Sequence, residues 1–247
     1  MQTTRTKKNL ILLFFIFSLL SCTKIAENEN KFSYFSEQFA DLKILRYQIP
    51  GFDKLTLDQK KLVYYLSQAG LAGRNIMYDQ NYRHNLKIRT ALENIYTNYN
   101  GEKLSDNWKK FEVYLKRIWF SNGIHHHYSN DKFNPGFSSE YLEKLLLDTN
   151  TSLDQDAFDV IFNDKDLKKV NLDASKGLVK GSAVNFYGPD ITEADVDEFY
   201  SKMKVPNSEK PISLGLNSKL VRENGEMLEI VWKLGGMYGE YIENIIF

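Results

Sequence analysis

The spacing of apolar residues changes along this chain, and that change limits the folds that it can adopt. Over most of the first 163 residues, apolar side chains recur at the three- and four-residue spacing of helices. Near residues 212–234 they alternate with polar ones, and Asn224-Gly225 between two such runs is typical of a type I′ hairpin turn. Helices first and strands later predict an α+β fold, with a small antiparallel sheet near residues 180–234.

Three segments carry the helical period most strongly. The first begins with the capping-box pair Thr56 and Gln59, the second spans residues 86–99, and the third is capped by Ser105 or Asp106. The apolar positions expected to share one buried face per helix are Leu62, Val63, Leu66, Ala69 and Ile76, then Leu86, Ile88, Ala91, Leu92, Ile95, Tyr96 and Tyr99, then Trp108, Phe111, Leu115, Ile118 and Trp119. Such stripes predict a packed helical bundle.

Shorter elements follow. We expect helices at residues 139–146 and 153–162, a strand at residues 183–188, and a helix capped by Thr192 that runs through Met203. The apolar residues expected to face inward from this last helix are Val196, Phe199 and Met203.

The first 22 residues have the parts of an export signal. A basic start precedes the apolar run Leu10–Leu20, whose eleven residues are too few for a helix to span a hydrocarbon core of roughly 30 Å. The run ends at Leu19-Leu20-Ser21-Cys22, which resembles the bacterial lipobox, in which the cysteine is lipidated. We therefore expect a membrane anchor at Cys22 and a place in the bacterial cell envelope. Since Cys22 is the only cysteine, no disulfide within the chain is possible.

These features divide the chain into four expected parts. They are a lipoprotein signal peptide at residues 1–21, a polar tether at 22–31, a helical part at 32–163 and a hairpin part at 164–247. The last part ends in an apolar helical stripe that stops at Phe247 without a cap or polar tail. We therefore expect an incomplete fold that continues past this residue.

The charge composition of the chain does not indicate a binding partner. Lysine plus arginine equals aspartate plus glutamate at 32 each, so no net field favours nucleic acid, and we expect no nucleic-acid partner. The sequence also has no Gly-rich phosphate loop, no serine nucleophile elbow and no helical His-Glu pair of a metalloprotease.

The segment Ser121–Asp131 holds three of the four histidines, His125, His126 and His127. In a strand, the first and third would share a face and the second would point away. A zinc site needs three or four converging ligands, and His84 is the only other imidazole. We therefore predict a polar loop after the third helix, and no metal bound by this chain.

Four long segments of the chain, in order, resemble the bacterial branch of the dipeptidyl peptidase III family. They are Phe39–Asn81, Tyr114–Phe137, Val184–Tyr200 and Leu214–Ile242, and they cover much of the chain after the signal. The resemblance implies a zinc exopeptidase that removes dipeptides from the amino end of peptides. It also implies two lobes around a cleft, one helical and zinc-binding, the other containing a small β-barrel to which the hairpin would belong.

In that family, zinc is held by the histidines of an HExxGH motif and by a later glutamate. The cation lowers the pKa of a bound water, and the glutamate of the motif activates that water. None of these residues lies in this chain, so we expect it to contain no catalytic residue and to be inactive alone. Zinc is expected in the full-length protein, with ligands beyond Phe247.

The resemblance also implies that the loop after the third helix lies along the substrate cleft. The candidate residues for contact with a peptide substrate are Asn122, His125 and Tyr128. An asparagine can hydrogen-bond to an extended peptide backbone, and a tyrosine offers a ring to a side chain.

A second hypothesis is a non-catalytic, lipid-anchored envelope protein that binds peptides or serves as a scaffold. Under this hypothesis the protein keeps the amino-terminal portion of the fold and has no zinc lobe.

Overall fold

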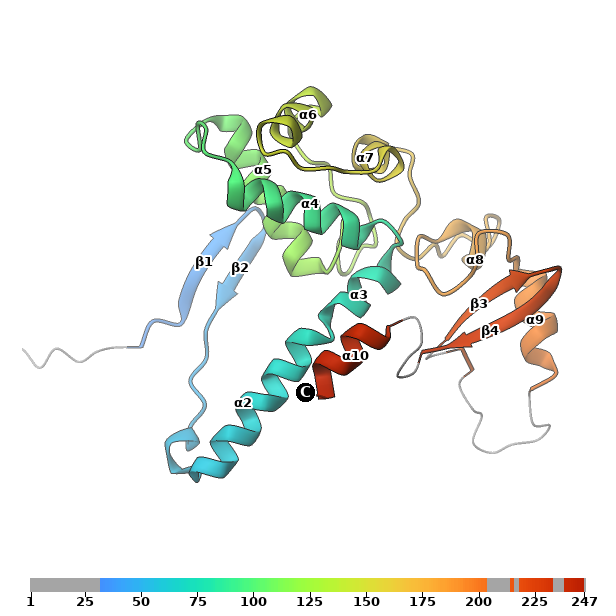
Figure 1. The fold of residues 1–247 in the computed structure, drawn as a ribbon, viewed down its shortest axis with the longest axis horizontal. Helices are drawn as coiled ribbons and strands as arrows, with labels where there is room; N and C mark the ends of the chain where they lie inside the picture. The colour runs from blue at the N-terminus through green and yellow to red at the C-terminus, as the bar shows by residue number, and fades with distance from the viewer. Residues whose placement is uncertain (1–31, 204–213, 216–217, 233–237, 247) are drawn as a thin grey trace, which may run out of the picture. The chain divides into compact units, whose positions relative to one another are not determined.

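The computed structural model describes residues 32–203, 214–215, 218–232 and 238–246, which form an α+β fold (Figure 1). The chain divides into two compact units, residues 1–48 and 49–247, and each is described by itself. In the first unit, β1 (Phe35–Phe39) and β2 (Leu42–Leu45) form an antiparallel hairpin in which Phe39 pairs with Leu42. The sequence did not predict this hairpin.

In the second unit, a 3₁₀ turn η1 (Phe52–Lys54) precedes α2 (Leu57–Ala72) and α3 (Arg74–Asn81). The predicted capping box of α2 is confirmed, because Thr56 Oγ1 accepts from the backbone N of Gln59 and Gln59 Oε1 accepts from the backbone N of Thr56. The predicted helical stripe is divided at Gly73, which places Ile76 in the next helix.

The prediction that the apolar stripe of α2 is core is wrong for the described residues. No side chain of α2 is buried, and Leu66 is 63% exposed. Helix α10 (Gly239–Ile246) lies along α2 (Figure 1). A Cβ at Gly73 would lie only 3.1 Å from Ile245 Cδ1. Periodicity predicts which face of a helix is apolar, but the described neighbours of α2 leave much of that face exposed.

The hydrophobic core lies among α4 (Asn85–Asn98), α5 (Asp106–Ser121), α6 (Ser139–Asp148) and α7 (Gln155–Phe162). The core side chains include Ile88, Leu92, Ile95, Trp108, Phe111, Tyr114, Leu115, Ile118, Leu142, Leu145 and Ile161. Most predicted positions of the second and third stripes are therefore confirmed as core. Of the two predicted caps of α5, Ser105 is the N-cap.

A second group of elements comprises α8 (Leu178–Gly181), α9 (Glu193–Ser201), β3 (Ser218–Glu223) and β4 (Glu226–Val231). The strands pair antiparallel, and the φ angles of 52° at Asn224 and 86° at Gly225 are those that a type I′ turn needs. The predicted hairpin is confirmed, although the predicted positions Ile212, Leu216 and Leu234 lie outside the described residues.

Two predictions in this region are wrong. Residues 183–188 do not form a strand, because their backbone N–H groups donate to three different segments of the chain. Ala183 donates to Lys168 O at 2.9 Å, Asn185 to Gln80 O at 2.8 Å and Gly188 to Leu220 O at 2.7 Å. Thr192 caps α9 as predicted, but the helix ends at Ser201 and Met203 is 44% exposed rather than inward.

Among the described residues, no helix is long and apolar enough to cross a membrane. The predicted signal segment and Cys22 lie outside the described residues.

Candidate functional site

The three consecutive histidines lie in a short hairpin-like loop between α5 and α6, which we call the histidine loop (residues 122–133). The backbone N of His126 donates to Asp131 O at 2.7 Å, and that of Phe133 donates to Ile124 O at 2.8 Å. The loop starts at Asn122, which is the C-cap of α5 and has a left-handed backbone conformation. The next residue, Gly123, has a φ of 144°. The prediction of a loop at the end of this helix is confirmed.

Close packing requires glycine at the start of the histidine loop. A Cβ at Gly123 would lie 2.1 Å from Nδ2 of Asn85, which no real contact permits. The side chain of Asn85 lies against this glycine because it joins two segments. Its Nδ2 donates to Tyr78 O at 3.0 Å, and its Oδ1 accepts from the backbone N of Ile124 at 3.1 Å. Asn85 therefore connects the end of α3 to the histidine loop.

His125 differs from its neighbours because it is buried, with 1% of its surface exposed. Its Nε2 donates to Leu167 O at 2.8 Å, and its ring packs edge-on against Tyr82 at 5.3 Å. Within the described part of the chain, Nδ1 has no hydrogen-bond partner. Burial lowers the pKa of His125 below its ordinary value, so the neutral ring is favoured.

The other two histidines turn toward each other instead of alternating as in a strand. The rings of His126 and His127 stack with centroids 4.4 Å apart. His126 Nδ1 accepts from the backbone N of Tyr128 at 3.1 Å and from that of Ser129 at 3.0 Å. This nitrogen therefore stabilises the turn at the tip of the loop.

The three predicted substrate-contact residues do not gather on one surface. Asn122 is half-buried, and its Oδ1 accepts from Arg74 Nε at 3.1 Å while its carbonyl accepts from Asn81 Nδ2 at 3.0 Å. His125 is buried, whereas Tyr128 is 84% exposed at the loop tip. Contact of these residues with a peptide stays a prediction.

Sequence reasoning missed a lysine that fixes the loop to a neighbouring helix. Lys132 Nζ donates to Val160 O at 2.9 Å and to Ile161 O at 2.8 Å, near the carboxyl end of α7. The carboxyl end of a helix has unpaired carbonyls and a negative partial charge, and an ammonium group there interacts favourably with both. No spacing in the sequence relates this lysine to a helix that starts 23 residues later.

The histidines predict a dependence of stability on pH. Burial lowers the pKa of both His125 and His84, and the nearby Arg83 further lowers that of His84. The relevant range runs from the ordinary pKa of histidine down to the lower pKa values in the folded state. As the pH falls through it, these histidines bind protons in the unfolded chain but stay neutral in the folded chain. Stability is therefore expected to fall across this window, by at most about 1.4 kcal/mol per pH unit for each histidine.

Urea unfolding at several pH values between 7 and 5 measures this effect, with His125→Gln as the test variant. The slope of stability against pH is expected to be shallower in His125→Gln than in the parent chain. A matched change without a titrating group, Leu172→Ala on an exposed side chain, is expected to keep the parent slope. An unchanged slope in His125→Gln would contradict a lowered pKa of His125 in the folded chain.

A second polar cluster joins four segments, and we call Asp79, Asn185, Lys219 and Tyr238 the polar junction. Asn185 Nδ2 donates to both oxygens of Asp79 at 3.2 Å, and Tyr238 Oη also donates to Asp79. Lys219 Nζ donates to Asn185 Oδ1 at 2.6 Å. Burial lowers the pKa of Lys219, an effect that the charge of Asp79 opposes. The sequence offered no signal for this cluster, because its members come from α3, an irregular segment, β3 and the residue before α10.

Beside the polar junction is a cavity of about 400 Å³, which we call the junction pocket. Its lining includes Tyr82, Arg83, Asp166, Asn185 and Lys219. The hydroxyl of Tyr82 donates to both Asp166 oxygens, at 3.2 and 3.0 Å. Burial and this neighbouring carboxylate raise the pKa of Tyr82 above its ordinary range. Since Lys180 also lines it, the pocket combines three cationic side chains with a hydrogen-bonded carboxylate.

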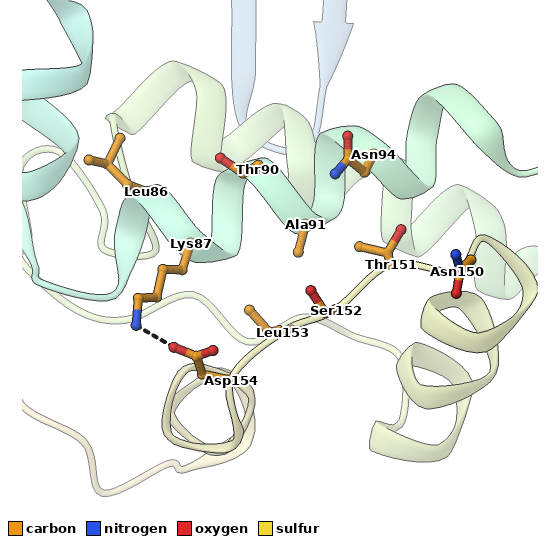
Figure 2. Close-up of a pocket in the computed structure, with 10 residues that line it drawn as sticks. All are labelled: Leu86, Lys87, Thr90, Ala91, Asn94, Asn150, Thr151, Ser152, Leu153 and Asp154. Carbon is orange, nitrogen blue, oxygen red and sulfur yellow. Dashed lines mark hydrogen bonds and ion pairs between the residues drawn. The ribbon is translucent and has the colours of Figure 1, made fainter. Parts of the chain in front are cut away.

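A separate pocket of about 450 Å³ lies between α4 and the segment that joins α6 to α7 (Figure 2). Thr90, Asn94 and Ser152 supply polar groups to its wall, and Lys87 forms an ion pair with Asp154 at its edge (Figure 2). Both charged side chains are largely exposed, so water screens this pair. The polar groups of this pocket can hydrogen-bond to a ligand, but the charges of Lys87 and Asp154 already neutralise each other.

Within the described residues, no group of three or more histidine, cysteine, aspartate or glutamate side chains is placed to hold a metal ion. No protein-family model matches this chain, and no curated protein matches it.

Proposed function

We propose that this chain is the amino-terminal portion of a zinc-dependent dipeptidyl peptidase. The complete protein would release dipeptides from the amino end of peptides and would be attached to a membrane of the bacterial cell envelope through Cys22. The proposal assigns zinc binding and catalysis to residues outside this chain, and gives the chain the role of building one side of the fold.

One observation carries the proposal: the four segments that resemble the family meet one another through specific side chains. Arg74 and Asn81 belong to the first segment and bind Asn122 of the second. In the polar junction, Asp79 of the first segment accepts from Asn185 of the third.

The fourth segment joins the same junction. Lys219 donates to Asn185, and Tyr238 donates to Asp79. These contacts place parts of all four segments in one connected body, as the proposed fold requires.

The geometry narrows what the predicted substrate-contact residues can do. Tyr128 is exposed and able to touch a ligand, whereas Asn122 is engaged by Arg74 and His125 is buried. We therefore propose that His125 acts only indirectly, by holding the histidine loop against Leu167.

The coding frame downstream of Phe247 tests the proposal. An HExxGH motif a few hundred residues further would support the peptidase, since that motif supplies two zinc ligands and the catalytic glutamate of the family. A stop codon directly after Phe247 would overturn the proposal in favour of a non-catalytic envelope protein that binds peptides or serves as a scaffold.

Membrane attachment through Cys22 has its own test. Cys22→Ser removes the thiol that lipidation needs, so the protein is expected to move from the membrane fraction to the soluble fraction of the cell. Each buried methylene of a lipid contributes about 0.8 kcal/mol to membrane binding, so losing the chains is expected to release nearly all of the protein. Ser18→Ala, in the same signal segment, is the control and should leave the protein in the membrane. Retention of Cys22→Ser in the membrane would contradict the anchor.

A further inference from the structure

The junction pocket has the size and walls of a ligand site. Its volume of about 400 Å³ lies within the range of small-molecule pockets. Val179, Val184 and Ile191 supply apolar surface, while Arg83 and Lys219 supply charge. Ligand pockets typically combine such apolar walls with a few convergent polar groups.

Three cations line the pocket, and Lys180 donates to Pro189 O at 2.7 Å. The other two, Arg83 and Lys219, lack a carboxylate partner among the residues that the structure describes. The Nε group of Arg83 donates to His84 Nε2 at 3.0 Å, and Lys219 Nζ donates to the neutral amide oxygen of Asn185. Since guanidinium has five N–H donors and ammonium has three, both side chains retain donors for a further group.

The nearest carboxylates are engaged elsewhere. Asp79 acts on Lys219 electrostatically, but its oxygens accept from Asn185 and Tyr238. Asp166, on the pocket wall, accepts from the hydroxyl of Tyr82. The pocket therefore holds positive charge that its own carboxylates do not pair.

Partly burying a cation without an anion is unfavourable, because water is lost and nothing replaces its interaction with the charge. Burial of Lys219 lowers its pKa; the charge of Asp79 opposes this effect, and the positive charge of Arg83 adds to it. An oxyanion between the two side chains would accept charge-assisted hydrogen bonds from both and remove their mutual repulsion.

We propose that the junction pocket binds a small ligand through an oxyanion group, a carboxylate or a phosphate, held between Arg83 and Lys219. The remainder of the ligand packs against the apolar walls, and Asp166 is placed to accept a hydrogen bond from it. This inference does not depend on the proposed peptidase function, because it uses no residue of the expected zinc centre.

Titration of the full chain with acetate and with inorganic phosphate, followed by amide NMR shifts, tests this site. At least one anion is expected to bind and to shift amide signals around the pocket. Acetamide has the shape of acetate without its charge, so it is expected to produce no such shifts. Whichever anion binds more tightly identifies the ligand as a carboxylate or a phosphate.

Two variants locate the binding. Lys219→Met and Arg83→Met should each weaken anion binding about tenfold or more, since hydrogen bonds to charged groups are the strong ones. The matched control is Lys87→Met, which removes a lysine from the pocket of Figure 2 and should leave anion binding unchanged.

Arg83 has an exposed side chain, so its replacement keeps the test available even if Lys219→Met does not fold. A second measurement needs no variant: the pKa of Lys219, followed by NMR, should rise when the anion binds. Absence of anion binding, equal binding of acetamide, or an equal loss in Lys87→Met would overturn the proposal.

Discussion

Replacing Asn85 with alanine is expected to lower the free energy of unfolding by about 3 kcal/mol. Asn85 is the first residue of α4, and its side chain is 0% exposed. Alanine would leave the buried N–H of Ile124 without its acceptor and would open a void beside Gly123. The carbonyl of Tyr78 would keep its bond from the backbone N of Tyr82, so one buried group, rather than two, loses its partner. Urea unfolding followed by tryptophan fluorescence measures the change.

Asn94→Ala provides a matched control, because Asn94 lies on the same helix and is exposed at the pocket of Figure 2. Its replacement is expected to change stability by no more than about 0.5 kcal/mol, as for most surface positions. Similar stabilities of the two variants would show that Asn85 does not hold the histidine loop to α3.

Local signals in the sequence predicted the elements whose formation depends on neighbouring residues. The Thr56 and Thr192 caps and the Ser105 cap each satisfy backbone groups within three residues, so their patterns are sufficient. The Asn224-Gly225 turn is equally local, since both residues adopt positive φ angles readily.

Features that depend on distant partners were not predictable in the same way. The segment at 183–188 has the composition of a strand, yet its N–H groups donate to carbonyls of Gln80, Lys168 and Leu220, which lie in separate parts of the chain. The stripe of α2 has the period of a core helix, but period carries no information about the neighbour that must cover it.

The candidate site shows the same division. The sequence located the histidine loop correctly, because Asn122-Gly123 ends a helix by favouring positive φ angles. It could not reveal that His125 is buried, since the acceptor Leu167 is 42 residues away. The polar junction and the junction pocket had no signal at all, because their residues belong to segments of unrelated pattern.

The largest expected effect concerns activity. The complete product of the coding frame is expected to release dipeptides from a dipeptidyl arylamide, whereas the 247-residue chain is expected to release none. The physical reason is that the proposed peptidase activates its attacking water with a zinc ion, and this chain has no HExxGH motif to hold one. In the complete product, replacing His126 and His127 with asparagine should leave the zinc content unchanged, since these rings are expected to bind no metal. Loss of zinc in that variant would show that the histidine loop is a metal site.

Dipeptide release and zinc content, measured together on the complete product and on the 247-residue chain, test the central claim most directly. The claim predicts one zinc ion and release in the complete product, with neither in the shorter chain. Release of dipeptides by the shorter chain, or a complete product without zinc and without release, would contradict it.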